Sequence, residues 1–295
     1  GEGDDGGELQ PLEVCGPPGL YTLICVNLKL TGCQPKRPIN VTEFYSEEIA
    51  RDTIYFAKKS YPDFDMRQVT RRALRPDPDG YWTVVPLGQG KADLGVRAGL
   101  VKHTNGMKTF GYVVSEPAAP GRVDAARAAA LGLPPGPAYA RLVRGEDVPL
   151  GDGTGRVLRA RDVVGPPLPG RKITIMADTY DATDLVELAK GSDLVVHEAT
   201  LANMMEQKAV SQGHACPRIA ADFANKAQAR ALVLTHFSPR YAPGGPAGME
   251  AAAAFVKEAA ADYKHGPVIA AEDFMVIQVA KRERRKEGGT ASPGN

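Results

Sequence analysis

The sequence has no long apolar run, little net charge and few cysteines. No stretch approaches the ~18 apolar residues of a membrane span, so no membrane-spanning helix is predicted. The net charge of +1 excludes recognition of nucleic acid through overall charge, so any such contact must come from a local basic patch. The four cysteines form no Cys-x-x-Cys pair, which argues against a disulfide framework and is typical of a reducing compartment; the compartment itself stays unknown.

The remaining composition is that of a globular protein rich in turns. Its 295 residues, 43% hydrophobic and 24% charged, suffice for one large domain or two modest ones. The 32 glycines and 24 prolines predict long loops. Residues 1–9 are acidic and glycine-rich, which is unlike a signal or transit peptide.

The first 114 residues mix strand-like and irregular segments. β-Branched and aromatic residues predict strands over 39–44, 81–86, 94–103 and 110–114. Residues 21–30 are apolar enough for a helix or a strand. Residues 47–59 fit a helix, and 60–80 read as an irregular insertion.

From residue 171 onward, strands and helices alternate, which is typical of an α/β fold with a parallel sheet. Pro217 is well placed in the first turn of a helix. The predicted strands are 172–177, 194–196, 232–234, 268–271 and 274–279, and the other predicted helices are 184–190 and 249–263. Residues 281–295 read as a charged helix end followed by a disordered tail.

Residues 118–170 differ in character from both flanks. They are punctuated by Gly and Pro, and residues 118–172 hold nine basic side chains against five acidic ones. Seven of the basic side chains are arginines within the insert: Arg122, Arg127, Arg141, Arg144, Arg156, Arg159 and Arg161. We therefore expect an inserted basic arm that can follow a phosphate backbone, although arginines on a solvated loop are otherwise unremarkable.

Polar side chains follow three of the predicted strands. The run 232–234 leads into Thr-His-Phe-Ser-Pro-Arg-Tyr at 235–241, the strand 172–177 leads into Asp178, and 194–196 leads into His197 and Glu198. Carboxyl ends of parallel strands share one sheet edge, so these groups should meet. A metal ligand, a hydroxyl and a guanidinium at one edge suit hydrolysis of a phosphodiester.

The candidate metal and acid–base residues are His103, Asp178, His214 and His236. A lone histidine is more often structural, but four of the five histidines lie beside a strand end or a glycine turn; His265 does not and is read as a surface residue. Asp178 could instead cap the N-terminus of the following helix, although Asp184 could also cap that helix. Ser238 and Arg240 could belong to a solvated turn.

Seven motifs together resemble the tRNase Z family of tRNA 3′-processing endonucleases, in the metallo-β-lactamase superfamily. They are Gly16-Pro17-Pro18-Gly19, His103 with Phe110-Gly111-Tyr112, the arm sequence 131–148, 172–179, 189–200, Gly213-His214, and 235–241. The arm and the His-Phe-Ser-Pro-Arg-Tyr sequence are specific to this family. The resemblance implies the C-terminal two-thirds of an αββα sandwich over 1–280, two zinc ions, a precursor-tRNA substrate and a homodimer.

The resemblance also implies a role for each matching residue. His103 would bind one zinc, His236 the other, and Asp178 would bridge them. His214 would be the general acid, a task that suits an imidazole near neutral pH. Glu198 would orient a metal ligand or the neighbouring backbone. The phosphate and RNA contacts would come from Ser238, Arg240, Arg141 and Arg144.

The sequence departs from the family in several places. No histidine precedes His103, so the metal-binding His-x-His-x-Asp-His segment is missing, and Ala177 and Ala215 replace the usual Gly and Ser. Residues 45–80 fit the family poorly. We expect either an N-terminally incomplete enzyme, inactive alone, that removes the 3′ trailer from precursor tRNA with zinc, or a non-catalytic relative that binds RNA or a dimer partner.

Overall fold

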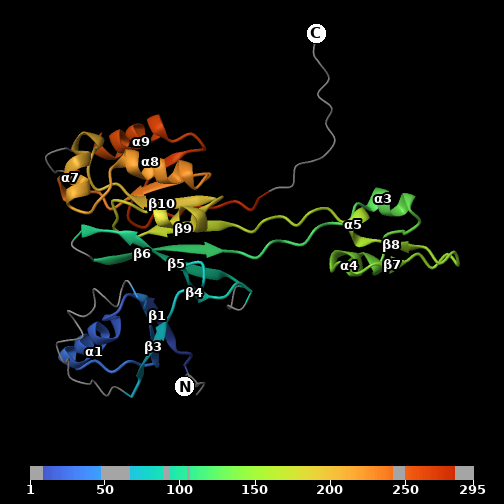
Figure 1. The fold of residues 1–295 in the computed structure, drawn as a ribbon, viewed down its shortest axis with the longest axis horizontal. Coiled ribbons are helices and arrows are strands. Elements are labelled where there is room, and N and C mark those ends of the chain that lie inside the picture. Colours follow the sequence, from blue (N-terminus) through green and yellow to red (C-terminus); the bar gives the residue numbers. More distant parts are fainter. Residues whose placement is uncertain (1–8, 48–66, 89–92, 105–106, 242–249, 283–295) are drawn as a thin grey trace, which may run out of the picture. The chain divides into compact units, whose positions relative to one another are not determined.

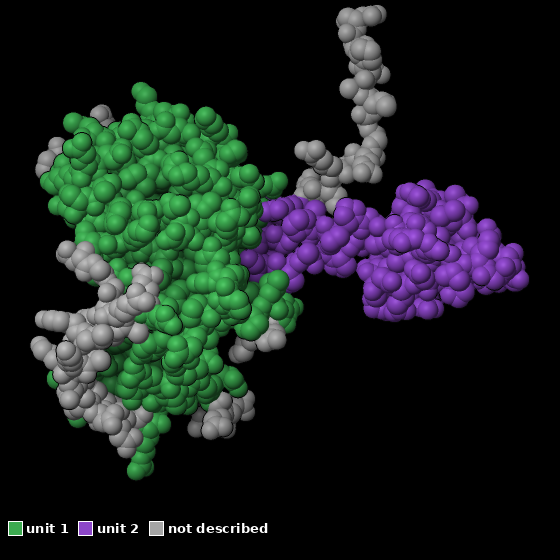
Figure 2. Space-filling view, in the orientation of Figure 1, with its two compact units in different colours: residues 1–114, 172–277 green, residues 115–171, 278–295 purple. Residues whose placement is uncertain are grey.

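The computed structural model describes residues 9–47, 67–88, 93–104, 107–241 and 250–282. The chain divides into two compact units, coloured separately in Figure 2. We call residues 1–114 with 172–277 the body, and residues 115–171, which belong to the second unit with 278–295, the arm. Within the described ranges, no helix has both the length and the apolar character needed to cross a membrane.

A seven-stranded mixed sheet forms the centre of the body (Figure 1). Neighbouring strands β9, β10, β11 and β12 run parallel, and β4 and β5 run antiparallel. In sheet order the strands are β12 (Val268–Ala270), β11 (Leu232–Thr235), β10 (Leu194–Glu198), β9 (Lys172–Met176), β6 (Lys108–Ser115), β5 (Gly95–Lys102) and β4 (Trp82–Val85). The carboxyl ends of β9, β10 and β11 therefore meet at one edge.

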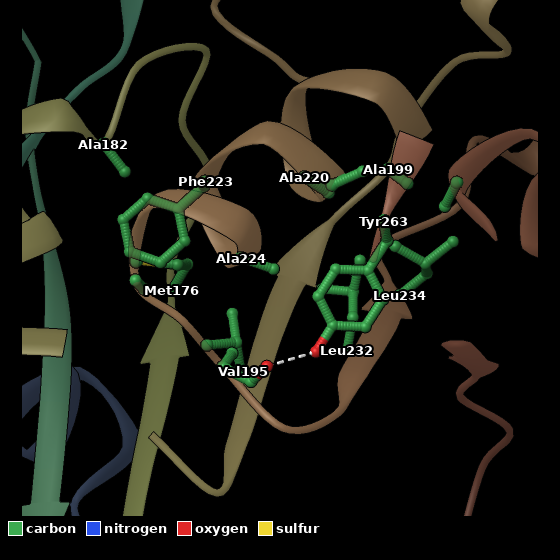
Figure 3. Close-up of a cluster of buried hydrophobic side chains, with 14 of the residues drawn as sticks. Met176, Ala182, Val195, Ala199, Ala220, Phe223, Ala224, Leu232, Leu234 and Tyr263 are labelled. Atoms are coloured by element: carbon green, nitrogen blue, oxygen red, sulfur yellow. Dashed lines mark hydrogen bonds between the residues drawn. The ribbon is translucent and has the colours of Figure 1, made fainter. Parts of the chain in front are cut away.

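Helices cover one face of this sheet, because alternate strand residues present apolar side chains to it. Val195 of β10 and Leu232 of β11 are opposite each other and pack with Phe223 (Figure 3). Tyr263 donates a hydrogen bond to the Ala229 carbonyl at 2.6 Å, and burial raises its pKa to about 12. The elements on this side are η2 (Thr183–Leu185), α6 (Val186–Ala189), η3 (Asn203–Met205), α7 (Glu206–Ser211), α8 (Pro217–Lys226), η4 (Pro239–Tyr241) and α9 (Glu250–Asp262).

A second, three-stranded parallel sheet packs against the first. Its strands are β1 (Leu12–Gly16), β2 (Ile39–Phe44) and β3 (Val69–Leu74). Val41 faces helix α1 (Leu20–Thr31) and packs with its Cys25. Phe44, on the opposite face of β2, packs on Phe110 of β6 with ring centroids 5.0 Å apart. The body is thus layered as helix, sheet, sheet and helices.

The arm has its own small core and is closed at its base. Leu142, Leu158 and Val163 are buried together. Its elements are α3 (Ala125–Ala130), α4 (Ala138–Val143), β7 (Val148–Pro149), β8 (Val157–Leu158) and α5 (Ala160–Val163). Ala119 and Leu168 exchange two backbone hydrogen bonds of 2.8 and 2.9 Å, so the two strands of the arm's stem run side by side.

The strands predicted around residues 39–44, 81–86, 94–103 and 110–114 are confirmed, and residues 21–30 form a helix. The helices predicted over 184–190 and 249–263 and at Pro217 are also confirmed, the first as a 3₁₀ turn followed by α6. Most of the predicted helix 47–59 and the tail from 283 lie outside the described residues.

Two predictions were wrong. The insertion 60–80 contains strand β3, which pairs in parallel with β2 along its whole length. Its consecutive, exposed residues Arg71 and Arg72 place a charged side chain on each face, so the alternation of apolar and polar residues that marks a strand is lost. Residues 274–279 form no strand and 281–282 no helix. Phe274 has a positive φ of 63°, and a turn bonds Met275 to Glu272, so the chain bends where the predicted strand begins.

We expect Phe255 to contribute strongly to the packing of the helix layer beside β11. It is 2% exposed and makes edge contacts with Phe237 and Tyr241, at centroid distances of 5.5 and 4.8 Å. We predict that Phe255→Ala lowers the free energy of unfolding by about 3–5 kcal/mol, because it leaves a cavity. Phe274→Ala, at a fully exposed phenylalanine, should change it by less than ~0.5 kcal/mol. Urea unfolding of both variants measures the difference, and equal effects would contradict this packing.

Candidate metal centre

Side chains from four strand ends and one loop converge at the carboxyl edge of the large sheet. His103 follows β5, Asp178 follows β9, Glu198 ends β10, and His236 follows β11. His214 comes from the loop between α7 and α8. They form two groups in which the potential ligand atoms lie within 4.8 Å of one another: His103, Asp178 and His214; and Glu198, His214 and His236.

The two groups share His214, and their other members also lie close together. His236 Nε2 lies 3.6 Å from Asp178 Oδ1, and the rings of His214 and His236 stack with centroids 5.4 Å apart. Both Asp178 and His236 keep a substantial part of their side chains exposed, at 40% and 48%. The Asp178 carboxylate and the His236 imidazole therefore lie at an accessible surface, which a substrate or an ion can reach.

Glu198 is the buried centre of the site, with only 1% of its side chain exposed. Its Oε1 accepts hydrogen bonds from Thr179 N at 2.7 Å and His214 Nδ1 at 3.1 Å. Its Oε2 accepts from Ala215 N at 2.9 Å and from the Thr200 hydroxyl. Four donors from three segments satisfy the carboxylate, as a buried charge requires.

These bonds fix the tautomers of two histidines. A carboxylate only accepts, so His214 must carry its proton on Nδ1. Thr200 gives its one hydroxyl proton to Glu198 and therefore accepts from His236 Nδ1, 2.8 Å away. In the neutral form of each ring, the lone pair of His214 and of His236 is therefore on Nε2.

The third imidazole is fixed by a backbone carbonyl. His103 Nδ1 donates to the Gly213 oxygen at 2.7 Å, which again leaves Nε2 with the lone pair. Gly213 has a φ of +83°, and an added Cβ would lie 2.4 Å from His103 Nδ1. Only glycine permits this approach. The sequence marked Gly213 as part of a motif but gave no sign of this contact.

His236 itself adopts a left-handed backbone, with φ of 58°. This conformation is unfavourable for a non-glycine residue, and such strain is often concentrated at functional sites. It directs the chain from β11 into the turn where Ser238 N donates to the Thr200 carbonyl at 3.1 Å. Thr200 therefore holds this turn through its backbone and His236 through its hydroxyl.

The helix-cap interpretation of Asp178 is wrong. The 3₁₀ helix η2 begins at Thr183, and the carboxylate that accepts from Thr183 N, at 2.9 Å, belongs to Asp181. Asp184 does not serve as this cap either, because it lies inside η2. Asp178 is therefore available to the metal centre.

The structure gives less direct evidence for the predicted phosphate-binding residues than for the metal centre. Arg240 is exposed in η4 and lies 3.5 Å from the Met205 sulfur. In the arm, Arg141 and Arg144 both bind Glu146 at 2.9 Å and lower its pKa. Their contact with RNA, like that of Ser238, stays a prediction. His265 is exposed, as expected.

The donor set fits zinc. Zinc binds neutral imidazole nitrogens and carboxylate oxygens, and a ligating histidine usually donates its other N–H to a carboxylate or carbonyl. His103, His214 and His236 all have Nδ1 engaged and Nε2 free, and Asp178 offers its oxygens between them. These donors are too few for two tetrahedral sites, so further ligands would have to come from elsewhere, such as a His-x-His-x-Asp-His segment.

Comparison with known proteins identifies similar sequences and one similar fold. Ribonuclease Z of Synechocystis sp. is 40% identical over 190 residues, which are 64% of this chain and 56% of that protein. The chain thus spans little more than half the length of this curated relative. Ribonuclease BN of Cronobacter sakazakii is 32% identical over 269 residues, 91% of this chain and 72% of its own.

The solved structure of human tRNase Z, short form, superimposes with a TM-score of 0.53 at 22% identity, covering 92% of this chain and 70% of that one. No family model matches the chain. The superposition and the layered sheets confirm the expected metallo-β-lactamase αββα fold. Together with the identity to these two ribonucleases over most of its length, this fold shows that the chain belongs to the tRNase Z family.

Proposed function

We propose that the chain is part of a zinc-dependent endoribonuclease that removes the 3′ trailer from precursor tRNA and leaves a 3′-hydroxyl. The observation that carries the proposal is the set of three imidazoles whose Nδ1 protons are engaged, gathered around Asp178 at the sheet edge. The names of the relatives, ribonuclease Z and ribonuclease BN, support an RNA substrate.

His103 and His236 would each hold one zinc ion through Nε2, and Asp178 would lie between the ions. His236 Nε2 and Asp178 Oδ1 are 3.6 Å apart, so both atoms could bind the same ion. When bound, the two ions would polarise the scissile phosphate and activate water. Glu198 and Gly213 would keep the histidine rings oriented for this task.

His214 would protonate the leaving 3′-oxygen of the ribose. Its Nδ1–H is held by the Glu198 carboxylate, whose negative charge compensates the ring when a second proton is added. That second proton can reside only on Nε2, which is the atom that would donate it. His214 belongs to both ligand groups, so a ligand role must be distinguished from an acid role by experiment.

The arm would supply affinity for the RNA. Among its described residues, Arg122, Arg127 and Arg159 form no ion pair, whereas Arg141 and Arg144 share Glu146. Phosphate groups could bind the first three directly and compete with Glu146 for the other two. Ser238 and Arg240 would contact the phosphate near the metal centre, and the active assembly would be a homodimer.

Substitution of Asp178 and His214 should have different consequences. In a form of the protein that binds both ions, we predict that Asp178→Ala loses zinc and cleavage together. His214→Ala should retain zinc and cleave about 10²–10⁴-fold more slowly, because only leaving-group protonation is lost. Zinc analysis and single-turnover cleavage of a precursor tRNA measure both effects.

The defect of His214→Ala should shrink for a nitrophenyl phosphodiester, whose leaving group barely needs a proton. His265→Ala, at an exposed histidine outside the site, is the control and should change neither property. Loss of zinc in His214→Ala would show that His214 is a ligand. An unchanged rate and zinc content would favour a non-catalytic RNA-binding relative.

Removal of the arm should separate RNA binding from chemistry. Residues 120–167 can be replaced by a short glycine linker, because Ala119 and Leu168 are already paired. We predict that tRNA binding weakens and loses much of its salt dependence, whereas hydrolysis of the nitrophenyl diester is unchanged. Unaltered tRNA affinity would refute the arm assignment, and loss of diester hydrolysis would show that the arm supports the body.

A further inference from the structure

A cavity with a volume of about 870 Å³ lies within the arm. It is bordered by the end of α4, the loop before β7, helix α5 and the two strands of the stem (Figure 1). Its volume is within the range of sites that bind small molecules. The described residues of the metal centre are not among those that line it. The arm therefore has a concave surface of its own, in addition to its exposed arginines.

Part of the cavity wall is apolar. Val143 and Val164 are half-buried in it, and Pro166 and Pro167 are exposed. Leu142, a buried residue of the arm's core, belongs to the same wall. An ionised phosphate gains nothing from such a wall, because burial against apolar atoms removes its water. An apolar ring that covers the wall takes both surfaces out of water, so the cavity favours a ligand with an apolar part.

Two accessible arginines also line the cavity. Arg159 is exposed and has no ion-pair partner in the described part of the chain. Arg161 is exposed and lies 4.0 Å from the Asp162 carboxylate, which is longer than a hydrogen bond. Among the described lining residues the one carboxylate is Asp147, and its Oδ1 accepts from Ala160 N at 3.0 Å. Two cations against one anion favour a negatively charged ligand.

The backbone of the stem fixes the shape of the cavity. Gly165 N donates to the Arg122 carbonyl at 2.9 Å, and Val123 and Val164 form a β-bridge. A Cβ added to Gly121 would collide with the Gly165 carbonyl, so only glycine lets the two strands approach this closely. A site that is already rigid loses little conformational entropy when a ligand binds.

We propose that this cavity binds one unpaired nucleotide of an RNA, with its base against the apolar wall and its phosphate on Arg159. Single-stranded RNA exposes its bases to side chains, whereas a duplex presents mainly its backbone. Arginine binds phosphate through two parallel N–H groups, and Arg161 supplies a second cation for the adjoining phosphate. The inference rests on the proposed function, in which the arm binds RNA, and adds that the arm recognises a nucleotide outside the double helix.

The test compares three fluorescent probes on the full chain: a uridine pentamer, the same backbone without its bases, and a short blunt RNA duplex. We expect anisotropy to show that the pentamer binds about tenfold more tightly than the abasic backbone, as for one base stacked on a protein surface. In methyl spectra, the Leu142 and Val143 signals should shift with the pentamer. The abasic backbone and the duplex should leave these signals unchanged.

Matched substitutions locate the nucleotide. Arg159→Ala should weaken pentamer binding about tenfold and reduce its salt dependence by about one released counterion. Arg127→Ala, at an exposed arginine of the arm that does not line the cavity, should change the affinity by less than about twofold. Val143→Trp should fill the cavity, so that the pentamer and the abasic backbone bind equally while the salt dependence remains.

Equal binding of the pentamer and the abasic backbone by the unmodified chain would overturn the proposal. So would equal effects of Arg159→Ala and Arg127→Ala. Displacement of the pentamer by a decaglutamate peptide at equal concentration would do the same, because it would indicate an acidic protein partner. If precursor tRNA is cleaved but the pentamer does not bind, this inference alone is wrong. If the pentamer binds as expected but precursor tRNA is neither bound nor cleaved, the proposed function alone is wrong.

Discussion

The Glu198 carboxylate accepts four hydrogen bonds inside the body, and the arrangement of the metal centre depends on it. It orients His214 directly and His236 through Thr200, and it anchors the backbone at Thr179 next to Asp178. Such a buried charge is stable only when its oxygens are satisfied, so loss of one donor affects the others. One residue thus links three strand ends and the α7–α8 loop.

The parallel sheet explains why one carboxylate can reach so many groups. Because β9, β10 and β11 run in the same direction, the residues that follow them emerge at one edge. The helix layer fixes the other side of these strands, through Phe255 against Phe237 and Tyr241, immediately after His236. Packing on one face of the sheet thereby fixes the positions of the metal-centre residues at its edge.

The sequence alone predicts the positions of several residues of the metal centre. Apolar runs that end abruptly in His, Asp or Glu predicted the positions of Asp178, Glu198 and His236, because strand period and strand direction determine where such residues emerge. Strand β3, which pairs with β2, was not predicted because its arginines break the apolar pattern typical of a strand. Residues 274–279 were wrongly predicted to form a strand, because their apolar content does not reveal the turn at Phe274.

Contacts between distant segments could not be predicted in this way. The carbonyl of Gly213 reaches His103 across 110 positions of the chain, and neither residue's neighbours in sequence indicate it. The tautomers depend on Thr200 giving its single proton to Glu198, which only the three-dimensional network shows. The unpartnered nitrogen of His197 is likewise a property of the packed core.

The most direct test of this network is the tautomeric state of the histidines in the metal-free chain. Long-range ¹⁵N–¹H spectra, recorded at a pH where the rings are neutral, distinguish a proton on Nδ1 from one on Nε2. The hydrogen bonds predict the Nδ1–H form for His103, His214 and His236, with exposed His265 as the internal reference. The Nε2–H form at any of the three would contradict the arrangement that makes them zinc ligands or, for His214, an acid.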